Sequence, residues 1–98
     1  MKKVLITGST GFLGRHLVKR LENDYDLLTP TSYELNVQDI VDLHKYIVEN
    51  SPDIIIHLAA VCGGIGANKE APADFFIKNS MMSINILSMS NYHKIDKL

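Results

Sequence analysis

Three regularly spaced glycines, Gly8, Gly11 and Gly14, are the residues of this chain best suited to binding a charged ligand. They follow the apolar run Val4-Leu5-Ile6, which predicts a buried strand, and they precede a segment with helical periodicity. At such a turn Gly8 permits a sharp bend, Gly11 lets a pyrophosphate approach the main chain, and Gly14 lets the helix pack closely. Free N–H groups at the helix start favour an anion. The pattern predicts a phosphate cradle formed by Gly8, Ser9, Thr10, Gly11, Phe12, Leu13 and Gly14.

The glycine spacing alone is a weak signal, because a tight turn that binds no ligand has the same pattern. Its context favours the phosphate-binding interpretation: Leu13, Leu17, Val18 and Leu21 recur at helical spacing behind the glycines. No Gly-Lys-Ser/Thr sequence follows, which excludes a P-loop.

Other reactive side chains form no recognisable catalytic or metal-binding arrangement. The single cysteine, Cys62, is more consistent with a small apolar loop residue than with a nucleophile. His57, at the end of an apolar run, is expected to be a core or rim histidine. His16, His44 and His93 have no carboxylate or cysteine at metal-ligand spacing. The sequence therefore predicts no metal site and no catalytic residue.

The composition describes one small globular domain. The chain has 98 residues, 46% hydrophobic and 21% charged, with a net charge of -1. This charge argues against nucleic acid or an anionic membrane as a partner. The apolar run after Lys2-Lys3 is too short for a signal peptide, and one cysteine is compatible with a reducing compartment. We predict a cytoplasmic location.

The elements alternate between strand and helix. Beyond the first strand we expect a helix over residues 12–23, a short strand over 25–29, a helix capped by Asn36 or Asp39, a strand over 53–60 and a long helix over 72–93. The Ile54-Ile55-Ile56 run is typical of a parallel strand buried on both faces. This predicts an α/β fold, the N-terminal half of a doubly wound parallel sheet (Rossmann fold), with strand order 3-2-1 and right-handed crossovers.

That sheet is incomplete. A strand order of 3-2-1 leaves one flank of the first strand open, since only Lys97-Leu98 follows the last predicted helix. We therefore expect residues 1–98 to be the N-terminal portion of a dinucleotide-binding domain, either the front of a larger polypeptide or a truncation. The glycine-containing loop 61–68 follows a strand end, where α/β sheets bind ligands.

Two blocks carry a family resemblance. The segments 7–14 and 57–60 resemble the cofactor loop and a strand end of the extended short-chain dehydrogenases, which include the NAD-dependent epimerases. The segment from Cys62 through Asn68 and Pro72 to Asn79 is more specific, and it is similar to the branch that epimerises and reduces GDP-4-keto-6-deoxymannose. The resemblance implies an NADP-dependent enzyme of nucleotide-sugar metabolism with a GDP-sugar substrate.

The resemblance also implies roles for individual residues. Residues 8–14 would bind the pyrophosphate, the connector from Ser32 to Val37 would pass the adenosine, and Leu58, Ala59 and Ala60 would lead toward the nicotinamide ribose. Gly63, Gly64 and Asn68 would border the sugar-nucleotide site, although Asn68 equally suits a loop cap. Asn85 matches a helix asparagine that supports the active site, and a solvent-facing position would explain it as well.

The departures from the family concern the cofactor and the chemistry. Thr10 and Ser32 stand where an arginine can bind a ribose 2′-phosphate, and no acidic residue directly ends the second strand, so NADP is inferred from the family and NAD stays open. The family's catalytic Ser and Tyr-x-x-x-Lys are absent: the fourth position after each tyrosine holds Thr29, Val37, Asn50 or Asp96. The chain alone is expected to be inactive.

Three functions stay open at this stage. The first is the cofactor-binding part of the GDP-sugar epimerase-reductase, the second a non-catalytic truncated nucleotide-binding fragment, and the third another extended short-chain epimerase or dehydratase. The long helix would pair across a homodimer, as in the family, or pack only on its own sheet.

Overall fold

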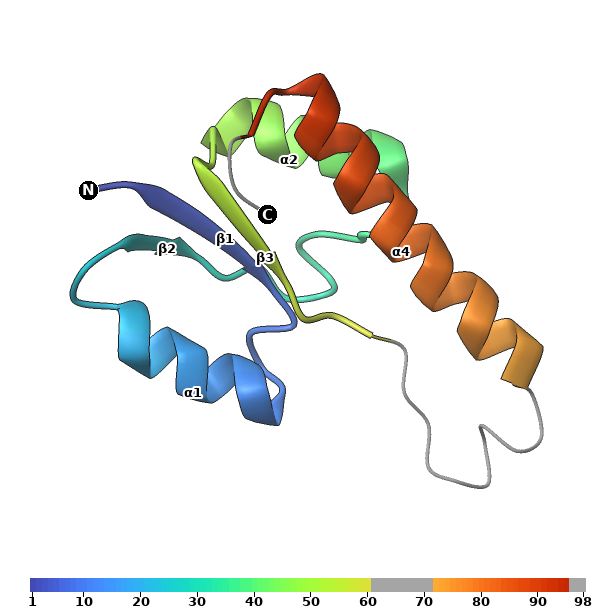
Figure 1. Ribbon diagram of the computed structural model, residues 1–98, viewed down its shortest axis with the longest axis horizontal. Coiled ribbons are helices and arrows are strands. Elements are labelled where there is room, and N and C mark those ends of the chain that lie inside the picture. The colour runs from blue at the N-terminus through green and yellow to red at the C-terminus, as the bar shows by residue number, and fades with distance from the viewer. Residues whose placement is uncertain (61–71, 96–98) are drawn as a thin grey trace.

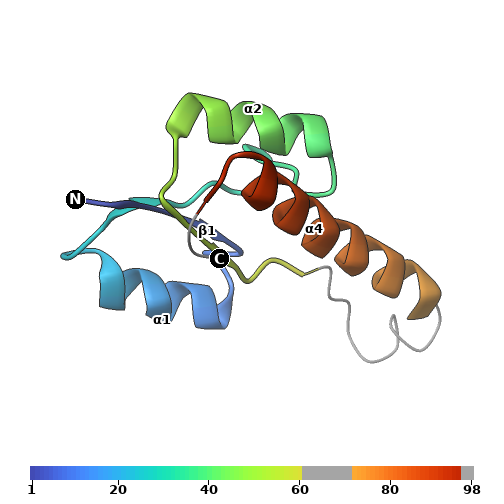
Figure 2. The same ribbon diagram turned by 45° about the horizontal axis from the view of Figure 1, so that its top comes forward.

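The computed structural model describes residues 1–60 and 72–95. The described residues form the strands β1 (Lys3–Thr7), β2 (Asp26–Leu28) and β3 (Ile54–His57) and the helices α1 (Phe12–Leu21), α2 (Ile40–Asn50) and α4 (Pro72–Tyr92). Helix α1 covers one face of the sheet, and α2 and α4 lie together on the other (Figure 1, Figure 2). This arrangement confirms the predicted α/β fold with a doubly wound parallel sheet.

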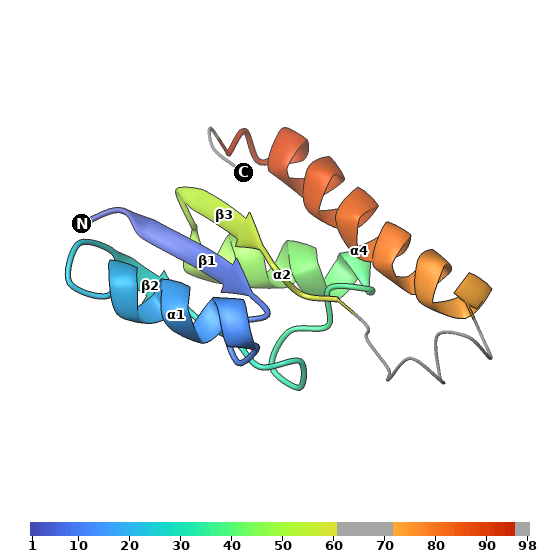
Figure 3. The same cartoon turned by 60° about the horizontal axis from the view of Figure 1, so that its bottom comes forward.

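The strand order is β2-β1-β3, so the predicted order 3-2-1 is wrong. Strand β1 is the centre: Lys3 pairs with Asp26 of β2, and Val4 pairs with Ile54 of β3, both in parallel. The predicted open flank of β1 is therefore occupied by β3. Across the sheet, the chain moves from β1 in one direction to β2 and then in the opposite direction, past β1, to β3. Because both crossovers are right-handed, reversing direction puts α1 and α2 on opposite faces (Figure 3).

Successive buried side chains of β1 pack on opposite faces of the sheet. Leu5 belongs to a buried cluster that also contains Leu35, Val37, Leu43, Ile47, Ile55, Met82 and Ile86, contributed mainly by the α2 and α4 side. Val4 and Ile6, one position either side of Leu5, are equally buried but lie outside that cluster. Successive side chains of a strand point to opposite faces, so Val4 and Ile6 face the α1 layer. Burial on both faces explains why the run is continuously apolar.

The element ends follow local hydrogen bonding. Helix α1 ends at Leu21, two residues before the predicted end. The carbonyl oxygen of Leu21 accepts the N–H groups of Asp24 and Tyr25 at 3.1 Å each. Asp39, not Asn36, caps α2, because its carboxylate accepts from the N–H of Val41 at 3.0 Å. Strand β3 is shorter than the predicted 53–60. In the part of the chain that the structure describes, no helix is long and apolar enough to cross a membrane.

Candidate functional site

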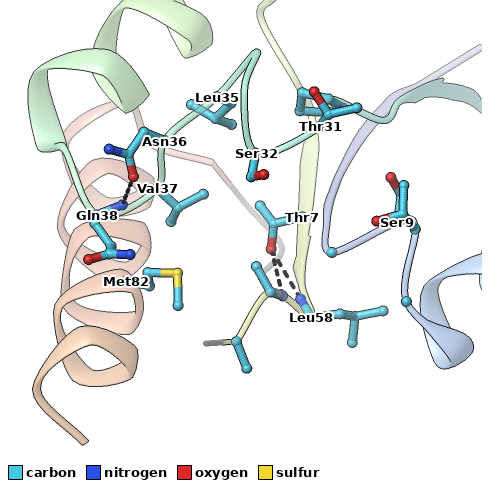
Figure 4. Close-up of a pocket in the computed structure, with 16 residues that line it drawn as sticks. Thr7, Ser9, Thr31, Ser32, Leu35, Asn36, Val37, Gln38, Leu58 and Met82 are labelled. Carbon is cyan, nitrogen blue, oxygen red and sulfur yellow. Dashed lines mark hydrogen bonds between the residues drawn. The ribbon is translucent and has the colours of Figure 1, made fainter. Parts of the chain in front are cut away.

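A pocket of about 340 Å³ opens at the carboxyl ends of β1 and β3 (Figure 4). The strand order reverses between these two strands, and such a switch point is where open α/β sheets bind ligands. Three segments and one helix side chain line the pocket: Thr7, Gly8, Ser9, Thr10, Gly11, Pro30, Thr31, Ser32, Leu35, Asn36, Val37, Gln38, Leu58, Ala59, Ala60 and Met82.

The glycine loop forms one wall, and two of its glycines are required by the chain itself. Gly8 has a φ of 75°, and a Cβ there would lie 2.7 Å from the carbonyl carbon of Leu58 and the nitrogen of Ala59. A Cβ on Gly14 would collide with the Gly8 carbonyl oxygen and lie 2.7 Å from the Ser9 Cα. Both positions therefore accept only glycine without a shift of backbone.

Gly11 differs, because the chain leaves the space beside it open. A Cβ on Gly11 would meet only the Gly8 carbonyl oxygen, at an ordinary 3.5 Å. Gly11 is also the N-cap of α1, makes no side-chain cap bond, and is followed by no acidic residue in the first turn. The helix start thus presents N–H groups and the positive end of its dipole without an internal anion to neutralise them. This geometry fits a phosphate of a bound dinucleotide.

The hydroxyl of Thr7 joins the two strand ends under the pocket (Figure 4). Its Oγ1 accepts the N–H of Leu58 at 3.1 Å and that of Ala59 at 3.2 Å. With both acceptor positions used, the hydroxyl hydrogen donates to Nδ1 of His57, 2.6 Å away. His57 therefore carries its hydrogen on Nε2, and burial lowers the pKa of this imidazole from 6.5, which favours the neutral form that Thr7 requires.

The connector between β2 and α2 forms the opposite wall. Its first turn is fixed by a reciprocal pair: the Thr31 N–H donates to Oε1 of Glu34 at 2.9 Å, and the Glu34 N–H donates to Oγ1 of Thr31 at 3.3 Å. This bond occupies the Glu34 carboxylate, which does not line the pocket. Among the described lining residues none is charged, and hydroxyls of Ser9, Thr10, Thr31 and Ser32 supply polar groups.

Most of the sequence-predicted site residues line this pocket. Nine of them do so: Gly8, Ser9, Thr10, Gly11, Ser32, Val37, Leu58, Ala59 and Ala60. Phe12, Leu13 and Gly14 do not; the side chains of Phe12 and Leu13 are exposed on α1, and Gly14 packs beneath the loop. The candidate substrate residues Gly63, Gly64 and Asn68, and Cys62, lie outside the described residues.

Sequence reasoning missed Thr7, Pro30, Thr31, Gln38 and Met82 as lining residues. The signal that could have indicated Thr7 is a hydroxyl residue between an apolar strand and the first glycine of the turn. Met82 belongs to the core cluster and also lines the pocket.

The remaining histidines form no metal site. Nδ1 of His44 and Nε2 of His93 are 3.0 Å apart, and their rings stack at the end of α4. Within residues 1–60 and 72–95 no three potential ligands gather around one point.

A parallel sheet wound in both directions, with a glycine-rich turn at its switch point, defines a Rossmann-type α/β domain. The chain belongs to the NAD dependent epimerase/dehydratase family, whose sequence profile matches residues 4–98. The family resemblance drawn from the sequence is therefore confirmed.

Individual relatives cover the whole chain but are much longer than it. GDP-L-colitose synthase of Yersinia pseudotuberculosis is 35% identical over 97 residues, 98% of this chain and 32% of that protein. GDP-L-fucose synthase of Escherichia coli (strain K12) is 33% identical over 99 residues, 99% of this chain and 31% of that protein. The chain thus spans less than a third of the length of either relative.

Solved structures agree with this assignment. MlghC, a GDP-mannoheptose C4 reductase from Campylobacter jejuni with NADP bound, has a TM-score of 0.89 and 28% identity, covering 99% of this chain and 29% of that chain. This solved relative is a reductase that holds NADP, and the chain covers less than a third of it.

Proposed function

We propose that residues 1–98 are the N-terminal part of the dinucleotide-binding domain of an NADP-dependent sugar-nucleotide epimerase/reductase. The observation that carries this proposal is the pocket at the switch point, where the space beside Gly11 is open and the start of α1 has no side-chain cap. In such an enzyme the nicotinamide supplies or accepts a hydride. The residues of this chain bind and orient the cofactor.

The cofactor assignment to NADP rests on the connector as well as on the relatives. A carboxylate at the end of the second strand would bind the ribose 2′-hydroxyl of NAD and repel a 2′-phosphate. Here the described lining residues after β2 are uncharged, and Thr10 and Ser32 offer hydroxyl donors instead. This environment accepts a phosphate, which supports NADP, although no cation is present there to exclude NAD.

The substrate that we propose is a GDP-linked 4-keto sugar. Three of the relatives share the GDP group in their names: GDP-L-colitose synthase, GDP-L-fucose synthase and GDP-mannoheptose C4 reductase. The specific reaction we favour is formation of GDP-L-fucose from GDP-4-keto-6-deoxymannose, with Gly63, Gly64 and Asn68 bordering the sugar nucleotide. We place this activity in the cytoplasm.

We also propose a homodimer formed through α4. This helix is apolar on two sides: Met82 and Ile86 are buried against the fold, whereas Phe76, Ile77, Met81, Ile84 and Leu87 are exposed by 44% to 73%. A stripe of exposed apolar side chains of this length is typical of an interaction surface.

Fluorescence titration of the purified protein with NADPH and NADH tests the cofactor assignment. We expect saturable binding that favours NADPH, with a dissociation constant above about 1 μM for residues 1–98 alone, because the pocket offers only uncharged groups. Sub-micromolar binding by this chain would contradict that account, and failure of both cofactors to bind would overturn the function.

Because residues 1–98 alone are expected to be inactive, turnover is measured on the complete gene product that contains them. This measurement separates the proposed enzyme from a non-catalytic fragment. Oxidation of NADPH on addition of GDP-4-keto-6-deoxymannose, but not of a dTDP-linked 4-keto sugar, supports the GDP-sugar assignment. Binding of NADPH without turnover of either substrate identifies a nucleotide-binding fragment.

A further inference from the structure

Asn85, in the middle of α4, is buried and bonded to the wall of the pocket rather than facing solvent. Its side chain is 8% exposed. The two hydrogens of its amide group are both used: Nδ2 donates to the carbonyl oxygen of Val37 at 2.9 Å and to that of Gln38 at 3.0 Å. Val37 and Gln38 line the pocket, so one side chain of α4 holds two consecutive peptide groups of the connector.

The connector depends on such external support, because residues 31–39 form neither helix nor strand. Other bonds fix its neighbouring positions: the Asn36 N–H donates to Oδ2 of Asp42 at 2.7 Å, and the Gln38 N–H donates to Oδ1 of Asn36 at 3.1 Å. The first of these bonds holds the connector to α2, and the second lies within the connector. Asn85 adds the bonds that hold it to α4.

Helix α4 also contributes directly to the same wall. Met82 lies three residues before Asn85, is 5% exposed, and lines the pocket beside Val37 and Gln38 (Figure 4). Residues three apart share a helix face, so Met82 and Asn85 act on the connector together. The width of the pocket on this side is therefore determined by where α4 holds the connector.

We propose that Asn85 is a positioning residue for the dinucleotide. It fixes the connector so that the adenosine half of the cofactor meets a preformed wall, and it makes cofactor affinity depend on the placement of α4. This inference rests on the proposed function, because it assigns a role to Asn85 within the same pocket.

The chemistry of the amide explains why asparagine is required. Two carbonyl oxygens need two donors from one short side chain, and the Asn amide group supplies them. Aspartate has the same shape but offers only acceptors, so Asn85→Asp sets carboxylate oxygens against both carbonyls. Alanine removes the donors without adding repulsion. A buried carbonyl that loses its donor is unfavourable, and we expect the connector to shift toward water.

The test compares Asn85→Asp and Asn85→Ala with Asn91→Asp, which makes the same charge change at an exposed position of α4. Dissociation constants are measured for 2′,5′-ADP, which carries the adenosine half, and for reduced nicotinamide mononucleotide, which lacks it. Circular dichroism selects a temperature at which each variant is folded. If Asn85→Asp does not fold, Asn85→Ala carries the comparison.

We expect the Asn85 variants to bind 2′,5′-ADP about tenfold more weakly, the effect of losing roughly one net hydrogen bond, and the mononucleotide within about twofold. Asn91→Asp should match the unsubstituted protein for both probes. Equal weakening of both probes would show a general structural role and overturn the proposal, as would unchanged affinity for 2′,5′-ADP. If the unsubstituted protein binds neither probe, the proposed function fails instead.

Discussion

Alanine substitutions at the three glycines should separate the demands of the fold from those of the ligand. In Gly14→Ala the new Cβ overlaps the Gly8 carbonyl oxygen and lies 2.7 Å from the Ser9 Cα, and both atoms belong to backbone that cannot rotate away. Helix α1 must then move off the loop. Overpacking of this kind costs about 2–3 kcal/mol of unfolding free energy, a large share of the roughly 5–15 kcal/mol expected for a domain.

Gly8→Ala combines two penalties. The φ of 75° costs an alanine about 1–2 kcal/mol, and the Cβ would also press on the backbone of Leu58 and Ala59 at 2.7 Å. Gly11→Ala meets only an ordinary contact at 3.5 Å, so its expected cost is about 0.5 kcal/mol, from the poorer N-cap. The methyl group nevertheless fills the open space beside Gly11 in which we propose that the pyrophosphate binds.

Two measurements on the same preparations decide the case. Thermal unfolding should show a melting temperature lower by at least about 10 °C for Gly14→Ala and by less than about 5 °C for Gly11→Ala. NADPH titration should show that Gly11→Ala, although folded, binds at least about tenfold more weakly. Wild-type affinity in Gly11→Ala would refute the phosphate assignment, and wild-type stability in Gly14→Ala would refute the close packing of α1.

The remaining predictions concern pH, the strand junction and the helix surface. Burial lowers the pKa of His57 from 6.5, so the folded chain binds fewer protons than the unfolded chain below that pH. The free energy of unfolding should therefore fall as pH drops below 6.5. In urea denaturation from about pH 7.5 to about pH 5, His57→Asn should reduce this dependence of stability on pH. A slope unchanged by the substitution would contradict the role of His57. Thr7→Val removes the donor to His57 and the acceptor of the Ala59 N–H, whereas the Leu58 N–H keeps its bond to the Thr7 carbonyl. This substitution should lower stability by about 1–3 kcal/mol in the same assay, and Thr7→Ser should lose less than half as much. Ile84→Glu should convert the proposed dimer to a monomer in sedimentation velocity, while Val48→Glu, at an exposed apolar position on α2, should not. An unsubstituted protein that sediments as a monomer would refute the proposed dimer.

Local pattern predicted the elements well because each carries its own signal. The continuous apolar runs of β1 and β3, the glycine turn, and the Asp39 cap are all determined within a few residues of sequence. The ends were less accurate: β3 stops at His57, beyond which the Leu58 N–H is shared between the Thr7 carbonyl and hydroxyl oxygens and the Ala59 N–H donates to the hydroxyl. That choice depends on a residue about fifty positions away.

The site residues also divide into those set by local sequence and those set by contacts with distant residues. Those at strand ends were predictable, since open α/β sheets bind ligands outside the carboxyl ends of their strands. Gln38 and Met82 were not, because they reach the pocket only through the packing of α4 on the connector. The amide of Asn85 makes that packing specific, and nothing in the helical periodicity around it indicates which backbone it binds.

The strand order is the error with the largest physical consequence, because the site exists only in the observed order. Neighbouring strands lie about 4.8 Å apart, so two strands separated by a third lie about 10 Å apart. In the order 3-2-1, β2 would stand between β1 and the Ile54–His57 strand, and Thr7 could not bond to His57 or to the N–H of Ala59. With β3 beside β1, these bonds form and the backbone after His57 closes against Gly8. The close backbone contact at Gly8, the hydrogen bonds of the Thr7 hydroxyl and the partial burial of His57 therefore depend on one strand adjacency.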